Sequence, residues 1–183
     1  MCNLLLVSFV LLVKGFSRRK EARMRKSVDV LIDQYKNNLF VIAFYVCKII
    51  HDAEDVVQDT FIQYISLKND FETEQHIRAW LIRVAINKAK NKNMSFFRRN
   101  TLPLEDYMET LTFASPESFE LFETVMKLPE KYRVTIQLFY YEDYSIKEIA
   151  DILKISESNV KVRLARGRKL LKNTLKEAWE DDE

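Results

Sequence analysis

Residues 145–172, SIKEIADILKISESNVKVRLARGRKLLK, have the pattern of two short helices separated by a tight turn. In the first half, apolar residues recur at helical spacing between charged ones: Ile146, Ile149, Ala150 and Leu153. Ser156 follows as an expected N-cap, so the second helix would begin at about Glu157. The segment therefore predicts a helix-turn-helix and makes this half of the chain α-helical.

The second predicted helix is densely positive. No acidic residue occurs between residues 158 and 172, and the outward positions carry six cations: Lys161, Arg163, Arg166, Arg168, Lys169 and Lys172. A helix that is only solvated usually mixes both signs of charge, because opposite charges four residues apart stabilise it. Like charges repel one another here unless phosphates neutralise them, so the pattern indicates DNA binding. Within this helix Gly167 costs about 1 kcal/mol relative to alanine, and one interpretation is that it allows close approach of DNA.

The composition extends the helical prediction to the whole chain. The protein has 183 residues, of which 48% are hydrophobic, with only two Gly and three Pro. These numbers predict an all-α fold with one domain or two small ones. Cys2 and Cys47 form no disulfide framework, which favours the cytoplasm. His51 and His76 lack further ligands at metal-binding spacing, so we predict no metal and no cofactor.

The first residues need a separate interpretation. Residues 4–13, LLLVSFVLLV, are apolar but too few to cross a bilayer, which takes about 20 residues. They also lack a basic stretch before them and a cleavage site after them, as a secretory signal would have. Membrane contact through residues 1–16 is not favoured. The alternative is that translation starts at Met24, because residues 20–23 could be encoded by a purine-rich ribosome-binding sequence.

Prolines mark a break in the middle of the chain. All three, Pro103, Pro116 and Pro129, lie between residues 100 and 130, around an acidic and Thr-rich stretch. We therefore predict an extension at residues 1–23, a helical domain at 24–95, a flexible linker at 96–117, a second helical domain at 118–176 and an acidic tail at 177–183. The apolar positions at helical spacing in the first domain are Val30, Leu31, Tyr35, Leu39, Phe40, Ile42, Val56, Val57, Phe61, Ile65, Ile77, Trp80, Leu81, Val84, Ala85 and Ala89. In the second domain they are Phe119, Phe122, Val125, Met126, Val134, Ile136, Leu138 and Phe139, and we expect both sets to be buried.

The first domain separates its charges along the sequence. Residues 51–64, HDAEDVVQDTFIQY, hold four acids and no lysine or arginine, whereas residues 83–99 hold six cations and no acid. On periodicity alone, the polar face of residues 51–64 is more often simply solvated. Neither domain has a Gly-rich phosphate loop or a nucleophile with a plausible base, so we predict no enzyme and no small-molecule substrate.

Three motifs of this chain, taken together and in their order, resemble a known family more specifically than any one of them does. Residues 51–64, then AWLIRVAINKAKNK at 79–92, then LPEKYRVTIQLFYYEDYSIKEIADILKISESNVKVRLARGRKLLK at 128–172 closely resemble the extracytoplasmic-function (ECF) group of bacterial sigma-70 family sigma factors. The resemblance implies a region 2 helical bundle and a region 4 helix-turn-helix. It also implies binding to core RNA polymerase through the β′ clamp helices and the β flap, recognition of two promoter elements, and promoter melting.

Three groups of site residues follow from the resemblance. Those expected to bind core polymerase are Asp55, Gln58 and Asp59. Those expected at the downstream promoter element are Trp80, Arg83, Asn87, Lys88, Lys90 and Asn91, although the apolar neighbours of Trp80 favour a core position for it. Those expected at the upstream element are Ser158, Asn159, Lys161, Arg163 and Arg166, the early residues of the helix reaching bases and the later ones phosphates.

Two further expectations concern partners. The resemblance implies a membrane-bound anti-sigma factor as an additional partner. A rival interpretation is a stand-alone helix-turn-helix regulator that acts without polymerase core. It accounts equally well for residues 145–172, but it does not account for the acidic and basic segments of the first domain.

Overall fold

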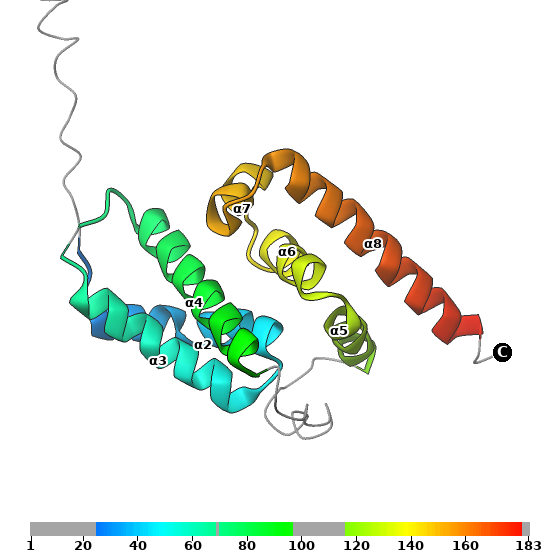
Figure 1. Ribbon diagram of the computed structural model, residues 1–183, viewed down its shortest axis with the longest axis horizontal. Coiled ribbons are helices and arrows are strands. Elements are labelled where there is room, and N and C mark those ends of the chain that lie inside the picture. Colours follow the sequence, from blue (N-terminus) through cyan, green and yellow to red (C-terminus); the bar gives the residue numbers. More distant parts are fainter. Residues whose placement is uncertain (1–24, 69, 97–115, 181–183) are drawn as a thin grey trace, which may run out of the picture.

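The computed structural model describes residues 25–68, 70–96 and 116–180. Within these ranges the chain forms seven helices (Figure 1), and the fold is all-α as predicted. In order they are α2 (Val28–Cys47), α3 (Ile50–Ser66), α4 (Glu74–Phe96), α5 (Pro116–Lys127), α6 (Glu130–Tyr140), α7 (Ile146–Leu153) and α8 (Glu157–Glu180). No helix in the described ranges has the length and apolar character needed to cross a membrane.

Helices α2, α3 and α4 pack against one another as the first bundle. On α2 the buried positions Leu31, Tyr35, Leu39 and Ile42 follow the helical repeat, so one stripe faces the core. Fully buried residues of α4 complete this core: Ile77, Leu81, Ile82, Ala85, Ile86 and Ala89.

Helices α5 to α8 form the second bundle, in which α8 runs along α6 and packs against α7 (Figure 1). The predicted helix-turn-helix is α7, a turn and α8. Ser145 and Glu148 form a capping box, in which the Ser145 hydroxyl accepts from the Glu148 N–H at 3.3 Å and the Glu148 carboxylate accepts from the Ser145 N–H at 2.9 Å. Ser156 caps α8 as predicted, since its Oγ accepts from the Asn159 N–H at 3.2 Å.

Several predicted core positions are wrong. Val30 is 50% exposed and Ile65 57% exposed, and Phe40, Val57 and Phe139 are only half-buried. The side chain of Phe119 lies outside those that the structure describes. On α3 the inward stripe runs through Thr60 and Tyr64 instead, since Thr60 bonds its hydroxyl to the Val56 carbonyl at 2.7 Å and so satisfies its polar group. A prediction from hydrophobicity alone therefore places the buried stripe of α3 about one residue away from its position in the structure.

The interpretation of Gly167 is also wrong. This glycine is buried against α6, where a Cβ would lie 2.7 Å from Ile136 Cδ1 and 3.4 Å from Tyr132 Cβ. Gly167 therefore allows α8 to approach α6 closely, and it does not face a DNA-binding surface.

Candidate nucleic-acid interface

The exposed face of α8 presents most of the residues predicted to read DNA. Ser158, Asn159, Lys161 and Arg166 are exposed, and Arg163 is half-buried. The Arg163 Nε donates to Asn159 Oδ1 at 3.1 Å, which places a guanidinium and an amide side by side near the start of the helix. Both groups can donate to base edges in a major groove.

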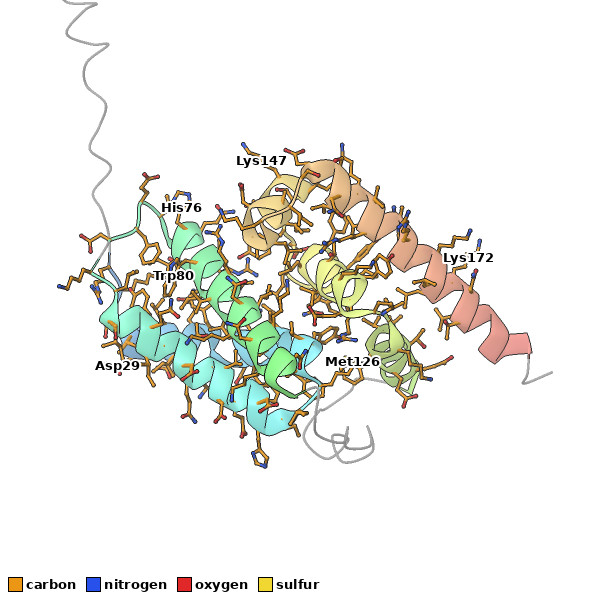
Figure 2. The ribbon with its side chains drawn as sticks, in the orientation of Figure 1. Asp29, His76, Trp80, Met126, Lys147 and Lys172 are labelled. Carbon is orange, nitrogen blue, oxygen red and sulfur yellow. The ribbon has the colours of Figure 1, made fainter. Side chains whose placement is uncertain are left out.

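The basic face also reaches back toward α6. Arg166 hydrogen bonds to the Tyr132 hydroxyl, and this contact lowers the pKa of the tyrosine. Lys172 projects outward farther along α8 (Figure 2), where it is exposed. The cations therefore extend over several turns of one helix, as a phosphate-binding surface requires.

A second polar stripe lies along α4. Arg83, Asn87 and Asn91 are four residues apart, so they share one face of the helix, and Asn87 and Asn91 are exposed. Lys90 lies nearby and is half-buried. Arg83 is engaged elsewhere, because its Nη2 donates to the Asp151 carbonyl of α7 at 3.0 Å.

Trp80 lies in an aromatic cluster at the start of α4 (Figure 2). Its ring meets Tyr64 edge-on at 6.1 Å and Phe71 at 5.8 Å between centroids, and the side chain is half-buried. It therefore packs on the edge of the core, in the place that its apolar neighbours favour, and keeps part of its surface open. Phe71 comes from the loop before α4 and is not among the predicted site residues.

The acids of α3 and the lysines of α4 face each other. Lys92 Nζ lies 2.7 Å from Asp55 Oδ2 and 3.7 Å from Asp52 Oδ1, and Lys88 Nζ lies 3.7 Å from Asp59 Oδ2. The hydrogen bond to Asp55 raises the pKa of Lys92. Residues predicted to bind polymerase on α3 and residues predicted to bind DNA on α4 are thus neighbours. Lys88 and Asp59 form an ion pair between these two groups.

An exposed apolar strip on α3 was missed by the sequence reasoning. Ile62 is 59% and Ile65 57% exposed, and with the exposed Gln58 they follow the helical repeat at intervals of four and three residues. These two side chains give the exposed face of α3 apolar area beside its polar groups. The exposure of this strip could have been predicted from the sequence, because Thr60 and Tyr64 can occupy the buried positions of α3 in its place.

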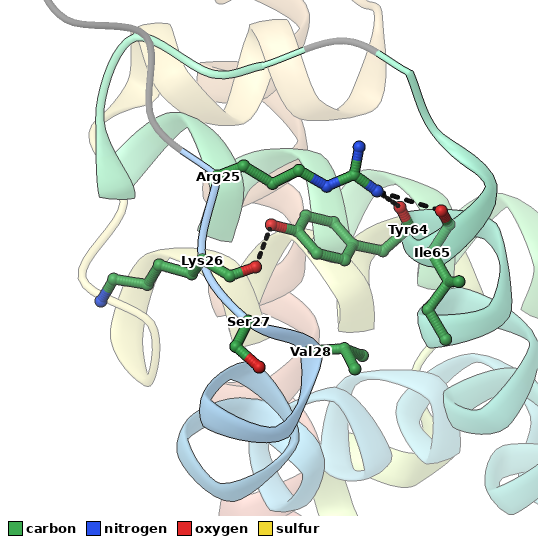
Figure 3. A pocket seen from close by; sticks show the side chains of 6 residues that line it. All are labelled: Arg25, Lys26, Ser27, Val28, Tyr64 and Ile65. Carbon is green, nitrogen blue, oxygen red and sulfur yellow. Dashed lines mark hydrogen bonds between the residues drawn. The ribbon is translucent and has the colours of Figure 1, made fainter.

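A shallow pocket opens where the chain enters α2 (Figure 3). It is lined by Arg25, Lys26, Ser27, Val28, Tyr64 and Ile65. Arg25 Nη2 donates to the carbonyls of Tyr64 at 3.2 Å and Ile65 at 3.0 Å, and the Tyr64 hydroxyl donates to the Lys26 carbonyl at 2.9 Å. These bonds fix the start of the first bundle to the end of α3.

Among the described residues, no cluster of three or more His, Cys, Asp or Glu side chains is arranged to hold a metal ion.

Comparison with known proteins identifies both bundles. The profile of Sigma-70 region 2 matches residues 31–102, and that of Sigma-70, region 4, matches residues 118–171. The ECF RNA polymerase sigma factor SigW of Bacillus subtilis is 30% identical over 165 residues, which cover 80% of this chain and 88% of the relative. The ECF RNA polymerase sigma-E factor of Escherichia coli is 29% identical, over 81% of this chain and 86% of the relative.

Two solved structures share the fold. The sigma factor RpoE of Bartonella quintana, in complex with the anti-sigma factor NepR, superposes with a TM-score of 0.66 at 20% identity, covering 81% of this chain and 96% of that one. CnrH, in complex with the cytosolic domain of CnrY, gives a TM-score of 0.59 at 25% identity, covering 91% and 96%. With both sigma regions matched in order and a relative aligned over nearly its full length, the chain belongs to the ECF RNA polymerase sigma factors of the sigma-70 family.

Proposed function

We propose that this sigma factor docks on core RNA polymerase through α3 and reads two promoter elements, the downstream one with α4 and the upstream one with α8. The observation that carries the proposal is the arrangement of three different surfaces on one chain. An exposed face of α3 combines amide, acidic and apolar groups, whereas α4 and α8 each present Asn side chains beside cations. A polymerase and a DNA duplex demand these two kinds of chemistry.

The proposed polymerase contact consists of Asp55, Gln58 and Asp59, to which the exposed Ile62 and Ile65 add apolar area. The carboxylates of Asp55 and Asp59 remain 60% and 52% exposed despite their lysine partners. They can therefore exchange these surface ion pairs, which are worth at most about 1 kcal/mol each, for cations of a docking partner.

The proposed downstream contact uses the α4 stripe and the edge of the aromatic cluster. Melting a duplex requires displaced bases to be captured by stacking and by hydrogen bonds, and Trp80, Asn87 and Asn91 supply these groups. Arg83, Lys88 and Lys90 would neutralise phosphates beside them.

The proposed upstream contact uses the first turns of α8. Ser158, Asn159, Lys161 and Arg163 would reach base edges, while Arg166 would hold a phosphate. A stand-alone regulator is not favoured, because it leaves the region 2 match at residues 31–102 without a role. An anti-sigma partner is also part of the proposal, supported by the structural neighbour RpoE, which was solved with the anti-sigma factor NepR.

The decisive test is core binding by a double charge reversal. We expect Asp55→Lys with Asp59→Lys to weaken binding to core RNA polymerase by about tenfold or more, because two attractive contacts become repulsive. Binding would be measured by fluorescence anisotropy, and circular dichroism would confirm that the helices persist. Unchanged core affinity would reject the assignment.

Two controls sharpen this test. Asp29→Lys with Asp33→Lys makes the same change of net charge on exposed positions of α2 and should leave core binding unchanged. Ile62→Ser avoids the ion pairs altogether and should also weaken core binding, whereas Val30→Ser, at a similarly exposed valine of α2, should not.

A further inference from the structure

The outermost stripe of α8 carries no charge in its first turns. Val162 is 46% exposed, whereas Val160 and Leu164, two residues before and after it, are 0% and 3% exposed. Since each residue turns a helix by about 100°, Val162 projects away from the core of the second bundle. Ser158 and Ala165 are also exposed and lie four and three residues from it, so they continue the same stripe. The part of α8 farthest from the core therefore consists of small or apolar side chains.

The cations of α8 lie on both sides of this stripe. One row contains Lys161, Arg168 and Lys172, which are seven and four residues apart. The other row contains Arg163 and Arg166, which are three residues apart. Two basic rows thus border an uncharged stripe along the same helix.

Two of these cations turn back toward α6. Arg166 hydrogen bonds to the hydroxyl of Tyr132 near the start of α6. Arg168 Nη1 donates to the hydroxyl of Tyr140, the last residue of α6, at 3.4 Å. Their guanidinium groups are therefore held at the sides of α8, and the stripe between the two rows stays open.

A major groove fits this arrangement of side chains. A helix with its side chains is about 10–12 Å across, and the major groove of B-DNA is about 12 Å wide. When a helix lies in the groove, its two sides face the phosphates and its outermost stripe faces the base edges. Basic rows at the sides and small side chains between them therefore suit the walls and the floor of the groove.

The side chain at the centre of the stripe discriminates among base edges. Val162 has no hydrogen-bonding side-chain atom, so a guanine, adenine or cytosine edge against it would lose bonds to water without replacement. Thymine presents a C5-methyl group in the major groove, and covering that group with an aliphatic side chain is favourable. Single exposed aliphatic residues are common on protein surfaces, but Val162 lies where the docked helix would meet a base.

We propose that Val162 is a specificity-determining residue for the upstream promoter element, and that it selects thymine at one position by covering the C5-methyl group. The inference rests on the proposed docking of α8 in the upstream element and adds the base that the helix selects there. Ser158, Asn159 and Arg163 discriminate among bases by hydrogen bonds, so none of them can supply this apolar contact.

The test removes the methyl group and nothing else. Holoenzyme, reconstituted from core RNA polymerase and the full chain, would first select upstream elements from a randomised promoter library. Each thymine selected on either strand would then be replaced in turn by uracil, which lacks only the C5-methyl group. At one position the affinity, measured by fluorescence anisotropy, should fall about fourfold, as expected for one buried methyl group.

Variants of α8 assign the effect to Val162. Val162→Ser should bind the thymine and uracil duplexes equally, whereas Val162→Ile should keep the discrimination because a branched aliphatic side chain remains. Leu170→Ser, at a leucine that is 39% exposed and lies outside the stripe, should also keep it. Valine and serine have similar helix propensities, so circular dichroism should show that α8 persists in Val162→Ser.

Three results would overturn the proposal: a selected element without thymine, equal affinity for thymine and uracil at every selected position, or discrimination that persists in Val162→Ser. Failure of the proposed function gives a different result. If α8 does not read the upstream element, the library selects no upstream sequence, and Arg163→Ala leaves the selection unchanged.

Discussion

At the scale of single residues, α8 separates groups able to read bases from groups able to hold phosphates. Arg163 is held by Asn159 through a bond of 3.1 Å, so its guanidinium is oriented before DNA arrives. Lys172 is exposed two and a half turns farther along and makes no such bond that would direct it to one base. Orientation of a planar donor favours sequence reading, whereas a mobile point charge favours phosphate binding.

We expect Arg163→Ala to relax promoter choice at one position of the upstream element, because a directed donor to a base edge is lost. Lys172→Ala should instead weaken binding by a similar factor on every promoter and make binding less dependent on salt. Transcription from a promoter library with reconstituted polymerase would measure both. An equal loss on all promoters for Arg163→Ala would identify it as a phosphate contact.

At the scale of secondary-structure elements, the helix-turn-helix depends on one unusual backbone conformation. Lys154 ends α7 with φ 55° and ψ 49°, in the left-handed region that glycine adopts most easily. Its main-chain N–H bonds to the Ala150 carbonyl, and the next N–H, of Ile155, bonds to the same carbonyl at 3.1 Å, as at helix ends that close with a left-handed residue. The chain therefore accepts strain at the turn that sets the angle between α7 and α8.

Replacing Lys154 by glycine should stabilise the second bundle by about 1 kcal/mol, because the side-chain clash in the left-handed region is removed. Thermal unfolding followed by circular dichroism would show a higher Tm. Lys169→Gly, at an exposed position inside α8, should have the opposite effect and cost about 1 kcal/mol. A lower Tm for Lys154→Gly would show that the lysine side chain stabilises this turn.

The helices and the turn could be predicted from the sequence because local signals were sufficient. The capping serine Ser156 and the apolar repeat of α2 involve neighbours along the chain, and both predictions are confirmed except at Val30. Burial of Arg133 could not be predicted in this way, since its partners include the carbonyl of Tyr45, which is distant in sequence. Gly167 was misinterpreted for the same reason, because its close neighbour Ile136 lies on another helix.

The candidate site was less predictable than the fold. Exposure of Asn87, Asn91 and Ser158 agrees with roles in binding, whereas the engagement of Arg83 by α7 depends on packing between bundles. Pairing of Lys88 with Asp59 likewise depends on the angle between two helices. Charge segregation along the sequence gave no sign that these opposite charges meet in space.

At the scale of the whole molecule, the interface between the bundles should respond to alkaline pH through Tyr144. This tyrosine is 3% exposed, and its hydroxyl has no hydrogen-bond partner among the described residues. Burial raises its pKa from 10.0 to about 12. Because the pKa is higher in the folded than in the unfolded state, this group leaves the free energy of unfolding unchanged below about pH 10. It lowers that free energy as the pH rises from 10 toward 12.

We expect Tyr144→Phe to increase the free energy of unfolding by up to about 1 kcal/mol at neutral pH, because an unpaired buried hydroxyl is removed while the ring under Arg78 remains. The advantage of the variant should grow between pH 10 and 12, where only the unsubstituted chain must bury an ionisable phenol. Urea titrations at several pH values would measure the difference. A difference that stays constant up to pH 12 would contradict this role of Tyr144.

Arg133 bonds both to the first bundle and within its own bundle. Besides Tyr45, it donates Nη1 to the carbonyls of Met126 at 3.1 Å and Leu128 at 2.7 Å, both within its own bundle. The bonds that join α5 to α6 therefore lie wholly within the second bundle and do not depend on its contact with the first.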